Sequence, residues 1–341
     1  MIMGAKIRLV AMETTNIQGD KFMQAFQRAL ALLALVGAGL AGAQDYPAAP
    51  ITMVVPFAAG SGTDAVARIV AKRLGERLRQ PVLVDNKAGA SAQIGAQYVA
   101  KAKPDGYTLF MTTNTSHSAN PALFASLKYD PIKDFTPIVR VGELPFAVVV
   151  GAKLPVKSMQ ELIDHAKANP GKLSYATPNS TSLVAAETIR RIAGIDMLGV
   201  PYKSSPQALT DLIGGQVQMY VADLGSSMAM IKAGSVRALA VTTQGPLKSL
   251  PGVAPVADTV KGFDLTSWNG ILGPAGMPRP IVDRLDAEVR QVLADKEVQA
   301  QLAQLGFEVW PSSGPDEFAN YVADQLAHWT ALIKQAGIRQ E

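Results

Sequence analysis

Residues 51–64 read ITMVVPFAAGSGTD, and this stretch decides the fold expected for the 341-residue chain. Residues 51–57 form an unbroken apolar run, as expected of a strand that is covered on both faces. A turn containing two glycines follows at residues 58–64, and apolar side chains then recur at helical spacing at Val66, Ile69, Val70, Leu74 and Leu78. A strand, a tight turn and a helix in direct succession predict an α/β protein.

The same alternation continues along the chain. Further strands are predicted at residues 81–85, 107–113, 146–150, 173–177, 217–222 and 236–242. Helical patterns lie between them, and one begins with a capping box at residues 158–161. A last helical face carries Phe318, Val322, Leu326, Trp329 and Ile333. Because strands alternate with helices, we expect mostly parallel sheets flanked by helices, and we read Trp268 as a core residue.

Composition and charge exclude several classes of protein. Hydrophobic residues make up 48% of the chain and charged residues 18%, which excludes a disordered protein, and the length favours two lobes or one large domain. The net charge of +4 is small and dispersed, so no nucleic-acid partner is expected. The absence of cysteine excludes disulfides, cysteine-ligated metals and cysteine nucleophiles. The three histidines lie far apart in sequence, and we expect neither a metal site nor a cofactor.

The N-terminal segment has the features of a secretory signal peptide. Residues 29–41 are uncharged and mostly apolar, Arg28 precedes them, and Ala41-Gly42-Ala43 ends the run. The run is shorter than the roughly 18 residues that span a bilayer, and its glycines make a buried core helix a poor alternative. We therefore expect cleavage after Ala43, a translation start at Met23 rather than Met1, and a mature chain in the bacterial periplasm.

The glycine turn is the strongest local sign of a binding site. In Gly60-Ser61-Gly62-Thr63-Asp64-Ala65, small residues let a ligand approach the backbone, and the first helical turn offers free N–H groups to an anion. The same letters fit a dinucleotide-binding G-x-G-x-x-A pattern with Asp85 after the next strand. A turn that only packs the helix against the strand is a third interpretation. Pro56 in the preceding strand and an exported location fit the dinucleotide interpretation poorly, so we favour a small anionic solute.

Three further polar segments follow predicted strands. Asn114, Ser116 and His117 belong to the loop NTSHS after the strand at 107–113, where ligands of α/β sheets bind. A Ser116–His117 nucleophile pair is the alternative, but the sequence shows neither an orienting acid nor a G-x-S-x-G elbow. A second loop lies between residues 173–177 and a helix expected to begin near Leu183, and it offers hydroxyls and helix N–H groups through Asn179, Ser180, Thr181 and Ser182. Asp223 ends the strand at 217–222, where it holds a ligand amine or water, or caps the next helix.

Several motifs in a fixed order make the chain similar to a known family. They are PFAAGSGTD at 56–64, VDNKAGA at 84–90, PDGYTL at 104–109, VPYK at 200–203, GGQV at 214–217, VRALAVT at 236–242 and WNGILGPAGMP at 268–278. In this order they resemble the Bug (TctC) family, the extracytoplasmic solute receptors of tripartite tricarboxylate transporters. The similarity runs from about Tyr46 almost to the C-terminus.

The resemblance implies a two-lobed periplasmic binding-protein fold of type II with a solute in the cleft. Lobe one comprises residues 44–144 and 264–341, lobe two comprises 145–263, and residues 1–43 form an extension and the signal peptide. The first loop holds one carboxylate of the solute through Phe57, Ala59, Gly60, Ser61, Thr63 and Asp64, and the loop 179–182 holds the other end. Tyr202 belongs to VPYK, where Ser204 replaces the family's next glycine, and such changes lie where the identity of the solute is decided.

The expected function is a non-catalytic receptor for an organic carboxylate, namely a di- or tricarboxylate, an aromatic carboxylate or an acidic amino acid. The resemblance implies a membrane permease as partner, with a sensing role as the other option, and we expect a monomer. If Asp64 or Asp223 faces the solute, amino acids or amides fit. If only hydroxyls and His117 face it, a dicarboxylate fits. A secreted hydrolase and a nucleotide-dependent enzyme are the alternatives.

Overall fold

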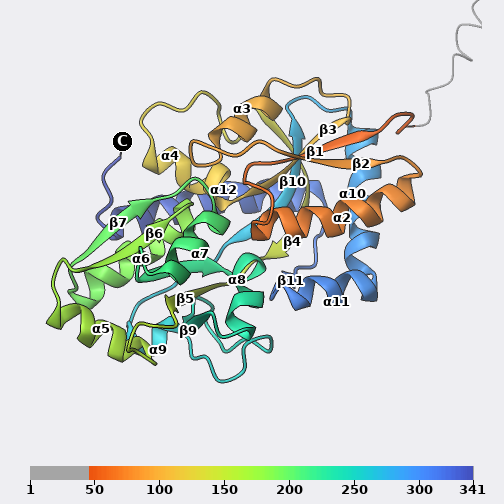
Figure 1. The fold of residues 1–341 in the computed structure, drawn as a ribbon. Helices are drawn as coiled ribbons and strands as arrows, with labels where there is room; N and C mark the ends of the chain where they lie inside the picture. Colours follow the sequence, from red (N-terminus) through yellow and green to blue (C-terminus); the bar gives the residue numbers. More distant parts are fainter. Residues whose placement is uncertain (1–45, 341) are drawn as a thin grey trace, which may run out of the picture. The chain divides into compact units, whose positions relative to one another are not determined.

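Two β-sheets carry the fold in the computed structural model, which describes residues 46–340 (Figure 1). The first sheet has the order β11-β4-β10-β3-β1-β2, with β1 (Ile51–Val55), β2 (Val82–Asn86), β3 (Thr108–Thr113), β4 (Phe135–Glu143), β10 (Trp268–Pro274) and β11 (Glu308–Val309). The second has the order β7-β6-β8-β5-β9, with β5 (Phe146–Gly151), β6 (Leu173–Thr177), β7 (Met197–Pro201), β8 (Met219–Asp223) and β9 (Val236–Val241).

Helices flank both sheets, so the predicted α/β class is confirmed. In chain order they are α2 (Gly62–Leu78), α3 (Gln93–Ala100), the π-helical turn η1 (Thr115–Ala119), α4 (Asn120–Leu123), α5 (Met159–Ala168), α6 (Ser180–Ala193), α7 (Ser205–Gly214), α8 (Leu224–Lys232), α9 (Val256–Thr259), α10 (Arg279–Ala294), α11 (Lys296–Gln304) and α12 (Pro315–Gln335). Ser158 caps α5 by accepting the Glu161 N–H, as the capping box predicts.

Each sheet is mixed, whereas the sequence pattern predicts mostly parallel sheets. β1 pairs in parallel with β2 and β3, but β10 runs antiparallel to both β3 and β4. In the second sheet β6 is parallel to β7 and β8, and β5 is antiparallel to β8 and β9. The reason is the path of the chain: β4 leads directly out of the first sheet into β5, and β10 leads back. Neighbouring strands that leave and return run in opposite directions.

The predicted strands are present within about two residues, but the sequence reading missed β4, β7, β10 and β11. β10 reads WNGILGP and is buried along its whole length in the middle of the first sheet. Its glycines, asparagine and terminal proline are uncommon in strands, so the sequence pattern does not predict a strand here. Gly270 is required there because a side chain would overlap the ring of Phe318. Trp268 is fully buried against Phe318 and Tyr321, as predicted for a core residue.

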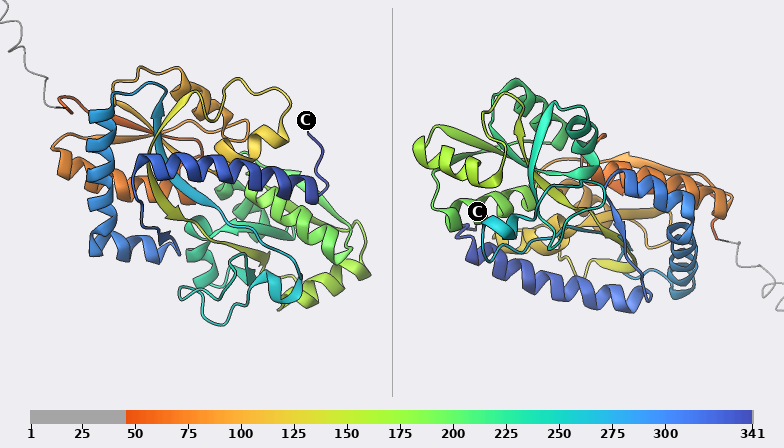
Figure 2. Two further views of the ribbon diagram at one scale, coloured as in Figure 1. Left: turned by 180° about the vertical axis from the view of Figure 1, so that it is seen from behind. Right: turned by 90° about the horizontal axis from the view of Figure 1, so that it is seen from below.

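The C-terminal helix α12 packs on the cores of both sheets. Phe318 and Val322 belong to the same hydrophobic cluster as Trp268 in the first sheet. Trp329 and Ile333, on the same predicted face, join the cluster that surrounds β6 and α6 of the second sheet. Figure 2 shows α12 running across the strands from one sheet toward the other. The predicted lobe limits assign all of α12 to lobe one, and those limits stay a prediction.

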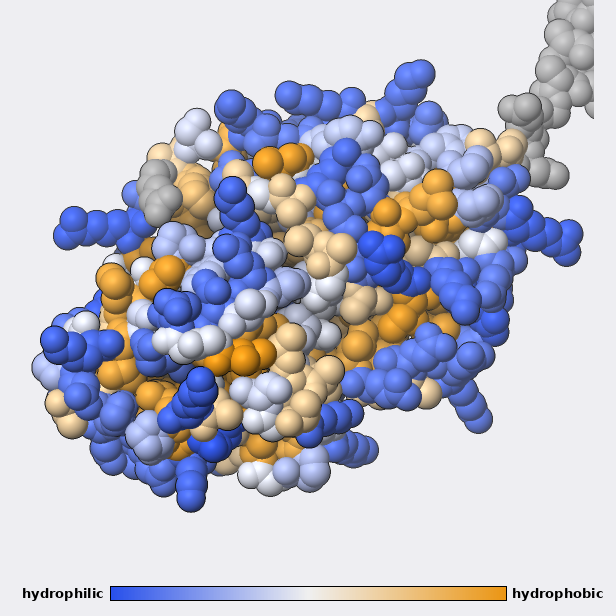
Figure 3. Space-filling model, viewed as in Figure 1, coloured by the Kyte–Doolittle hydropathy of each residue, from blue (hydrophilic) through white to orange (hydrophobic). Residues whose placement is uncertain are grey.

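The surface mixes polar and apolar residues. On the face shown in Figure 3, hydrophobic residues emerge in separate areas among hydrophilic ones. Within residues 46–340 no helix combines the length and hydropathy needed to cross a membrane. The same part of the chain contains no cluster of three or more acidic or histidine side chains arranged to hold a metal ion. The expected signal peptide and its cleavage after Ala43 lie outside the described residues.

The pairing of β11 with β4 supplies a test of the fold. A side chain at Gly142 would overlap the backbone oxygen of Glu308 and the ring of Phe307. The backbone oxygen of Glu308 cannot move away as a flexible side chain can. We therefore expect Gly142→Ala to lower the free energy of unfolding by about 1–3 kcal/mol in urea denaturation. Gly214→Ala is the control, since nothing lies within 4 Å of a side chain there. Equal destabilisation by both variants would contradict the packing described.

Candidate functional site

The starts of α2, α6 and α8 converge on one small cavity between the two sheets. The N-caps of α2, α6 and α8 are Ser61, Asn179 and Asp223, and all three line the cavity. Each cap accepts the backbone N–H three residues onward, over 3.3, 2.9 and 2.8 Å respectively. These helices follow β1, β6 and β8. The cavity therefore lies at the carboxyl ends of parallel strands from both sheets, where α/β proteins bind ligands.

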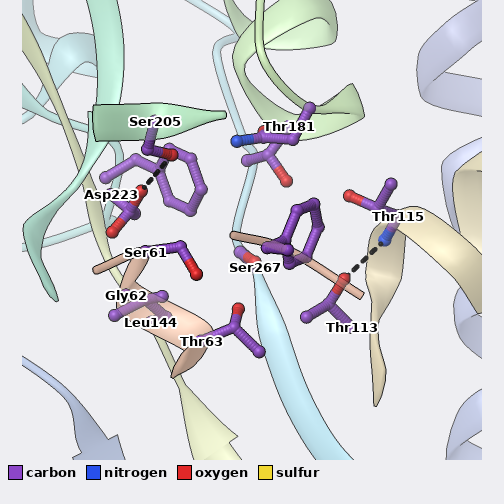
Figure 4. A pocket seen from close by; sticks show the side chains of 13 residues that line it. Ser61, Gly62, Thr63, Thr113, Thr115, Leu144, Thr181, Ser205, Asp223 and Ser267 are labelled. Atoms are coloured by element: carbon purple, nitrogen blue, oxygen red, sulfur yellow. Dashed lines mark hydrogen bonds between the residues drawn. The ribbon is translucent and has the colours of Figure 1, made fainter. Parts of the chain in front are cut away.

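Neutral hydroxyl groups dominate the walls of the cavity. In Figure 4 the hydroxyls of Ser61, Thr63 and Thr181 point toward the space between the helices. Asp223 is the only charged residue among the described residues that line it. The other lining residues are Phe57, Gly62, Thr113, Thr115, Leu144, Phe146, Ser205 and Ser267. The volume is about 20 Å³, which is room for about one water molecule, so a larger solute requires the two halves to part.

Gly62 allows α2 to approach α8 of the second sheet. A side chain at Gly62 would overlap the Asp223 carboxylate and would stand 2.8 Å from Leu144 Cδ2. A side chain at Gly225, in the first turn of α8, would lie 2.5 Å from Gly62 Cα. The two helix starts thus meet backbone to backbone. The Gly62 N–H also faces the Asp223 carboxylate and stabilises its charge.

Side-chain hydrogen bonds join the two halves beside the cavity. Asn114 donates from Nδ2 to Thr181 Oγ1 over 2.9 Å, and its Oδ1 accepts from Ser267 Oγ over 2.6 Å. Ser180 Oγ donates to Thr115 Oγ1 over 2.9 Å. Asn114, Thr115 and Ser267 lie at the ends of first-sheet strands, whereas residues 180 and 181 begin α6. These three hydrogen bonds beside the cavity all join neutral side chains.

Asp64 holds the first loop and does not line the cavity. Its carboxylate accepts from the Gly60 N–H, from Arg68 and from Asn86, over 2.8–3.0 Å. Asn86 donates in addition to the Phe57 oxygen, so β2 fixes the loop at both ends. Burial alone would raise the pKa of Asp64, but the three hydrogen bonds outweigh it and hold that pKa below its usual 3.8.

Asp223 faces the cavity and also caps a helix. Its Oδ1 accepts the Ser226 N–H over 2.8 Å, and its Oδ2 accepts from Ser205 Oγ over 3.0 Å. Tyr220 donates in turn to Ser205. Burial raises the pKa of Asp223, and the hydrogen bonds from Ser226, Ser205 and Gly62 offset part of that rise. The structure thus confirms that Asp223 caps α8, and its contact with a ligand amine or a water stays a prediction.

Ser116 and His117 lie in the core of the first half rather than at the cavity. His117 is fully buried, its ring meets the edge of Phe135, and its Nδ1 lies 2.6 Å from Thr112 Oγ1 and 3.1 Å from Ser116 Oγ. Burial lowers the pKa of His117 to about 3, so the ring is neutral at physiological pH. A nucleophile pair enclosed in aromatic packing has no access to a substrate, which removes the structural basis of the hydrolase interpretation.

The dinucleotide interpretation also finds no support in the geometry. Asp85 is paired with Lys87 over 2.9 Å. The start of α2, which would have to receive a pyrophosphate, instead meets Asp223 and Leu144. The close approach at Gly62 thus serves protein packing.

The structure brings six of the predicted site residues to the cavity: Phe57, Ser61, Thr63, Asn179, Thr181 and Asp223. The remaining predicted residues Ala59, Gly60, Asp64, Asn114, Ser116, His117, Ser180, Ser182 and Tyr202 do not line it. Ser180 and Asn114 form the hydrogen bonds beside it, Ser182 donates to the Val221 oxygen, and Tyr202 donates to Asp211. The role of each predicted residue in binding stays a prediction.

Sequence reasoning missed Thr113, Leu144, Phe146, Ser205 and Ser267. Thr113 ends a predicted strand, and Leu144, Phe146 and Ser267 lie where the chain passes between the sheets. The position of a residue at a strand end or at a crossover is the signal that could have found them.

The ion pair of Asp64 predicts a pH-dependent loss of stability. Because the pKa of Asp64 is lower in the folded than in the unfolded protein, its contribution is present above pH 4 and is lost as the pH falls through the folded value. We expect Asp64→Asn to lower the free energy of unfolding by about 1–2 kcal/mol at pH 7 and by less at pH 3, in urea denaturation. A difference that is the same at both pH values would contradict this role.

Comparison with known proteins agrees with the fold. Residues 66–338 match the sequence model of the family described as "Tripartite tricarboxylate transporter family receptor" (TctC). The periplasmic binding protein BugD is 34% identical and superposes with a TM-score of 0.83, covering 87% of this chain and all of that one.

Two ligand-bound structures are also similar. R. palustris Rpa4515, solved with adipate, is 34% identical with a TM-score of 0.84, covering 87% of this chain and 100% of that chain. MatC from Rhodopseudomonas palustris, solved with bound malate, is 31% identical with a TM-score of 0.79, covering 84% of this chain and 100% of that chain. The family match spans most of the sequence, and its members are receptors. The chain therefore belongs to the tripartite tricarboxylate transporter receptor (TctC) family and is a periplasmic solute-binding protein rather than an enzyme.

Proposed function

We propose that the protein captures a small organic carboxylate between its two lobes and delivers it to a membrane permease of the tripartite tricarboxylate type. The observation that carries this proposal is the convergence of capped helix starts from both sheets on one hydroxyl-lined cavity. Free N–H groups at a helix start favour an anion, by about 0.3–1 kcal/mol when exposed and by more when buried. Relatives crystallised with adipate and with malate support a carboxylate.

Neutral donors suit a receptor that must also release its solute. None of the described lining residues is an arginine or a lysine, so this cavity contains no unpaired cation. The carboxylate oxygens of Asp223 are already engaged by Ser205 and by the Ser226 N–H. Asp223 therefore does not require a solute amine. A carboxylate can instead bind to the hydroxyls of Ser61, Thr63 and Thr181.

Solute binding and lobe closure are coupled in this proposal. A ligand shifts the protein toward the closed form only by its greater affinity for that form. Groups from both sheets surround the cavity, so a bound carboxylate gains contacts that the separated lobes cannot provide. The proposed lobes are residues 44–144 with 264–341, and residues 145–263. The closed receptor, exported as a monomer after cleavage behind Ala43, is then the form that the permease or a sensor partner recognises.

A thermal-shift screen tests the proposed function directly. Aliphatic di- and tricarboxylates, aromatic carboxylates, acidic amino acids, amides and NAD are each added at a hundredfold excess over the expected dissociation constant. A binding carboxylate should stabilise the protein by about 2.7 kcal/mol. Ser61→Ala and Thr181→Val should reduce that stabilisation, because each removes one hydroxyl from the cavity. A shift with NAD alone, or a carboxylate shift that both variants leave unchanged, would contradict the proposal.

Gly62→Ala tests whether closure is needed for binding. The added methyl group holds α2 away from Asp223 and Leu144, so we expect solute affinity to fall at least tenfold in isothermal titration. Gly214→Ala is again the matched control, because its methyl group meets no neighbour. Melting temperatures without solute separate loss of binding from loss of folding. Wild-type affinity in Gly62→Ala would show that the approach of α2 to α8 does not matter for the solute.

A separate experiment tests the proposed export to the periplasm. N-terminal sequencing of the protein isolated from the periplasm should begin at Gln44. A sequence that begins at Met1 or Met23 would contradict export with cleavage.

A further inference from the structure

A large groove lies directly beside the small cavity. Its volume is about 630 Å³, within the usual range of small-molecule sites, whereas the cavity offers about 20 Å³. One wall consists of Ser91 and Gln93 at the start of α3 together with Leu123 and Phe124 after α4. The other wall comes from β6, α6 and β7 of the second sheet. The groove is therefore formed by both halves, as the cavity is.

The cavity and the groove share a wall that a small movement would open. Asn179, the N-cap of α6, lines both spaces. Thr115 lines the cavity, Ser180 lines the groove, and the hydrogen bond between their hydroxyls joins the two halves at this boundary. Breaking this hydrogen bond would remove one of the contacts that separate the two spaces.

The backbone beside the groove is held in an unfavourable conformation. Ala90, Ser91 and Ala92 have φ values of 45°, 49° and 70°, in the left-handed region that residues other than glycine rarely adopt. The Ser91 oxygen accepts a hydrogen bond from Asn120 Nδ2 over 2.8 Å, which fixes the segment. Strain of this kind persists where the surrounding structure maintains it, and it gathers at ligand sites.

The side chains that line the groove suit a solute that is partly apolar. Leu123, Phe124 and Leu183 provide apolar surface, and Ser91, Gln93 and Thr177 provide hydrogen-bonding groups. Glu187 is the one carboxylate among the described lining residues, and Tyr175 and Arg190 already engage it. Arg339, which is exposed, is the one cation among these lining residues, so the groove has no buried unpaired charge that would demand a cationic ligand.

We propose that the groove is a second compartment of the solute site, which holds the carbon chain of an elongated carboxylate whose acid group lies in the cavity. This inference rests on the proposed function and adds the length of the solute to it. An acid too short to reach the groove leaves it to water. A longer one buries additional methylene groups against Leu123, Phe124 and Leu183, and each buried methylene should increase affinity about fourfold.

A chain-length series tests the groove. Succinate, adipate and suberate are titrated into the full chain and into two variants of α3. Gln93→Trp fills the groove from the first residue of the helix, and Gln97→Trp, one turn later and outside the groove, is the matched control. In the wild type and in Gln97→Trp we expect suberate to bind at least tenfold more tightly than succinate. In Gln93→Trp that advantage should disappear while succinate keeps its affinity.

The outcomes separate this inference from the proposed function. If succinate binds as tightly as suberate in the wild type, or if Gln93→Trp keeps the preference for suberate, the groove does not hold the solute and the proposed function still stands. If none of the three acids binds, and no other carboxylate of the thermal-shift panel does, the proposed function fails and the groove assignment fails with it. Gln93→Phe replaces the tryptophan variant if melting without ligand shows that Gln93→Trp does not fold.

Discussion

The close approach of Gly62 to the start of α8 is the contact on which the site depends. Two helices from different sheets meet there without intervening side chains, and a methyl group at either glycine would separate them. This contact places Ser61, Gly62 and Asp223 around one point. It also brings residues 114 and 115 within hydrogen-bonding distance of α6. The cavity and its boundary with the groove exist because these helix starts can come so close.

The two aspartates near this contact have different tasks because their partners differ. Asp64 forms an ion pair with Arg68 and accepts a hydrogen bond from Asn86. It therefore fixes the loop before α2 and contributes no net charge to the cavity. Asp223 has no cationic partner and relies on hydroxyl and N–H donors, and burial therefore raises its pKa. In the proposed function, the helix starts and hydroxyls bind the carboxylate without a fixed positive side chain and release it when the lobes part.

Much of the fold could be predicted from the sequence. The spacing of apolar residues and the residue types of turns can both be read within short stretches. The glycine turn after β1, the N-caps Ser61, Asn179 and Asp223, and the buried face of α12 all follow from a few adjacent residues. The mixed pairing of the sheets could not be predicted in the same way. β4 and β10 carry proline and glycine, and their antiparallel pairing depends on the passage of the chain between the sheets.

The site shows the same division between local and long-range information. Ser61, Asn179 and Asp223 could be predicted near the site, because a strand followed by a polar residue is visible in one short stretch. His117 was expected near a ligand, but the π-helical turn η1 directs it into packing with Phe110 and Phe135. Ser205 and Ser267 reach the cavity from elements far away in sequence, so only the folded chain brings them together.

A crystal structure of the protein grown with the carboxylate that stabilises it most is the measurement that tests the central claim most directly. The account predicts two lobes that part only enough to admit the solute, with a carboxylate oxygen within hydrogen-bonding distance of Ser61 or Thr63 on one side and of Thr181 on the other. A carboxylate that contacts only one lobe, or that binds outside the space between α2 and α6, would contradict it.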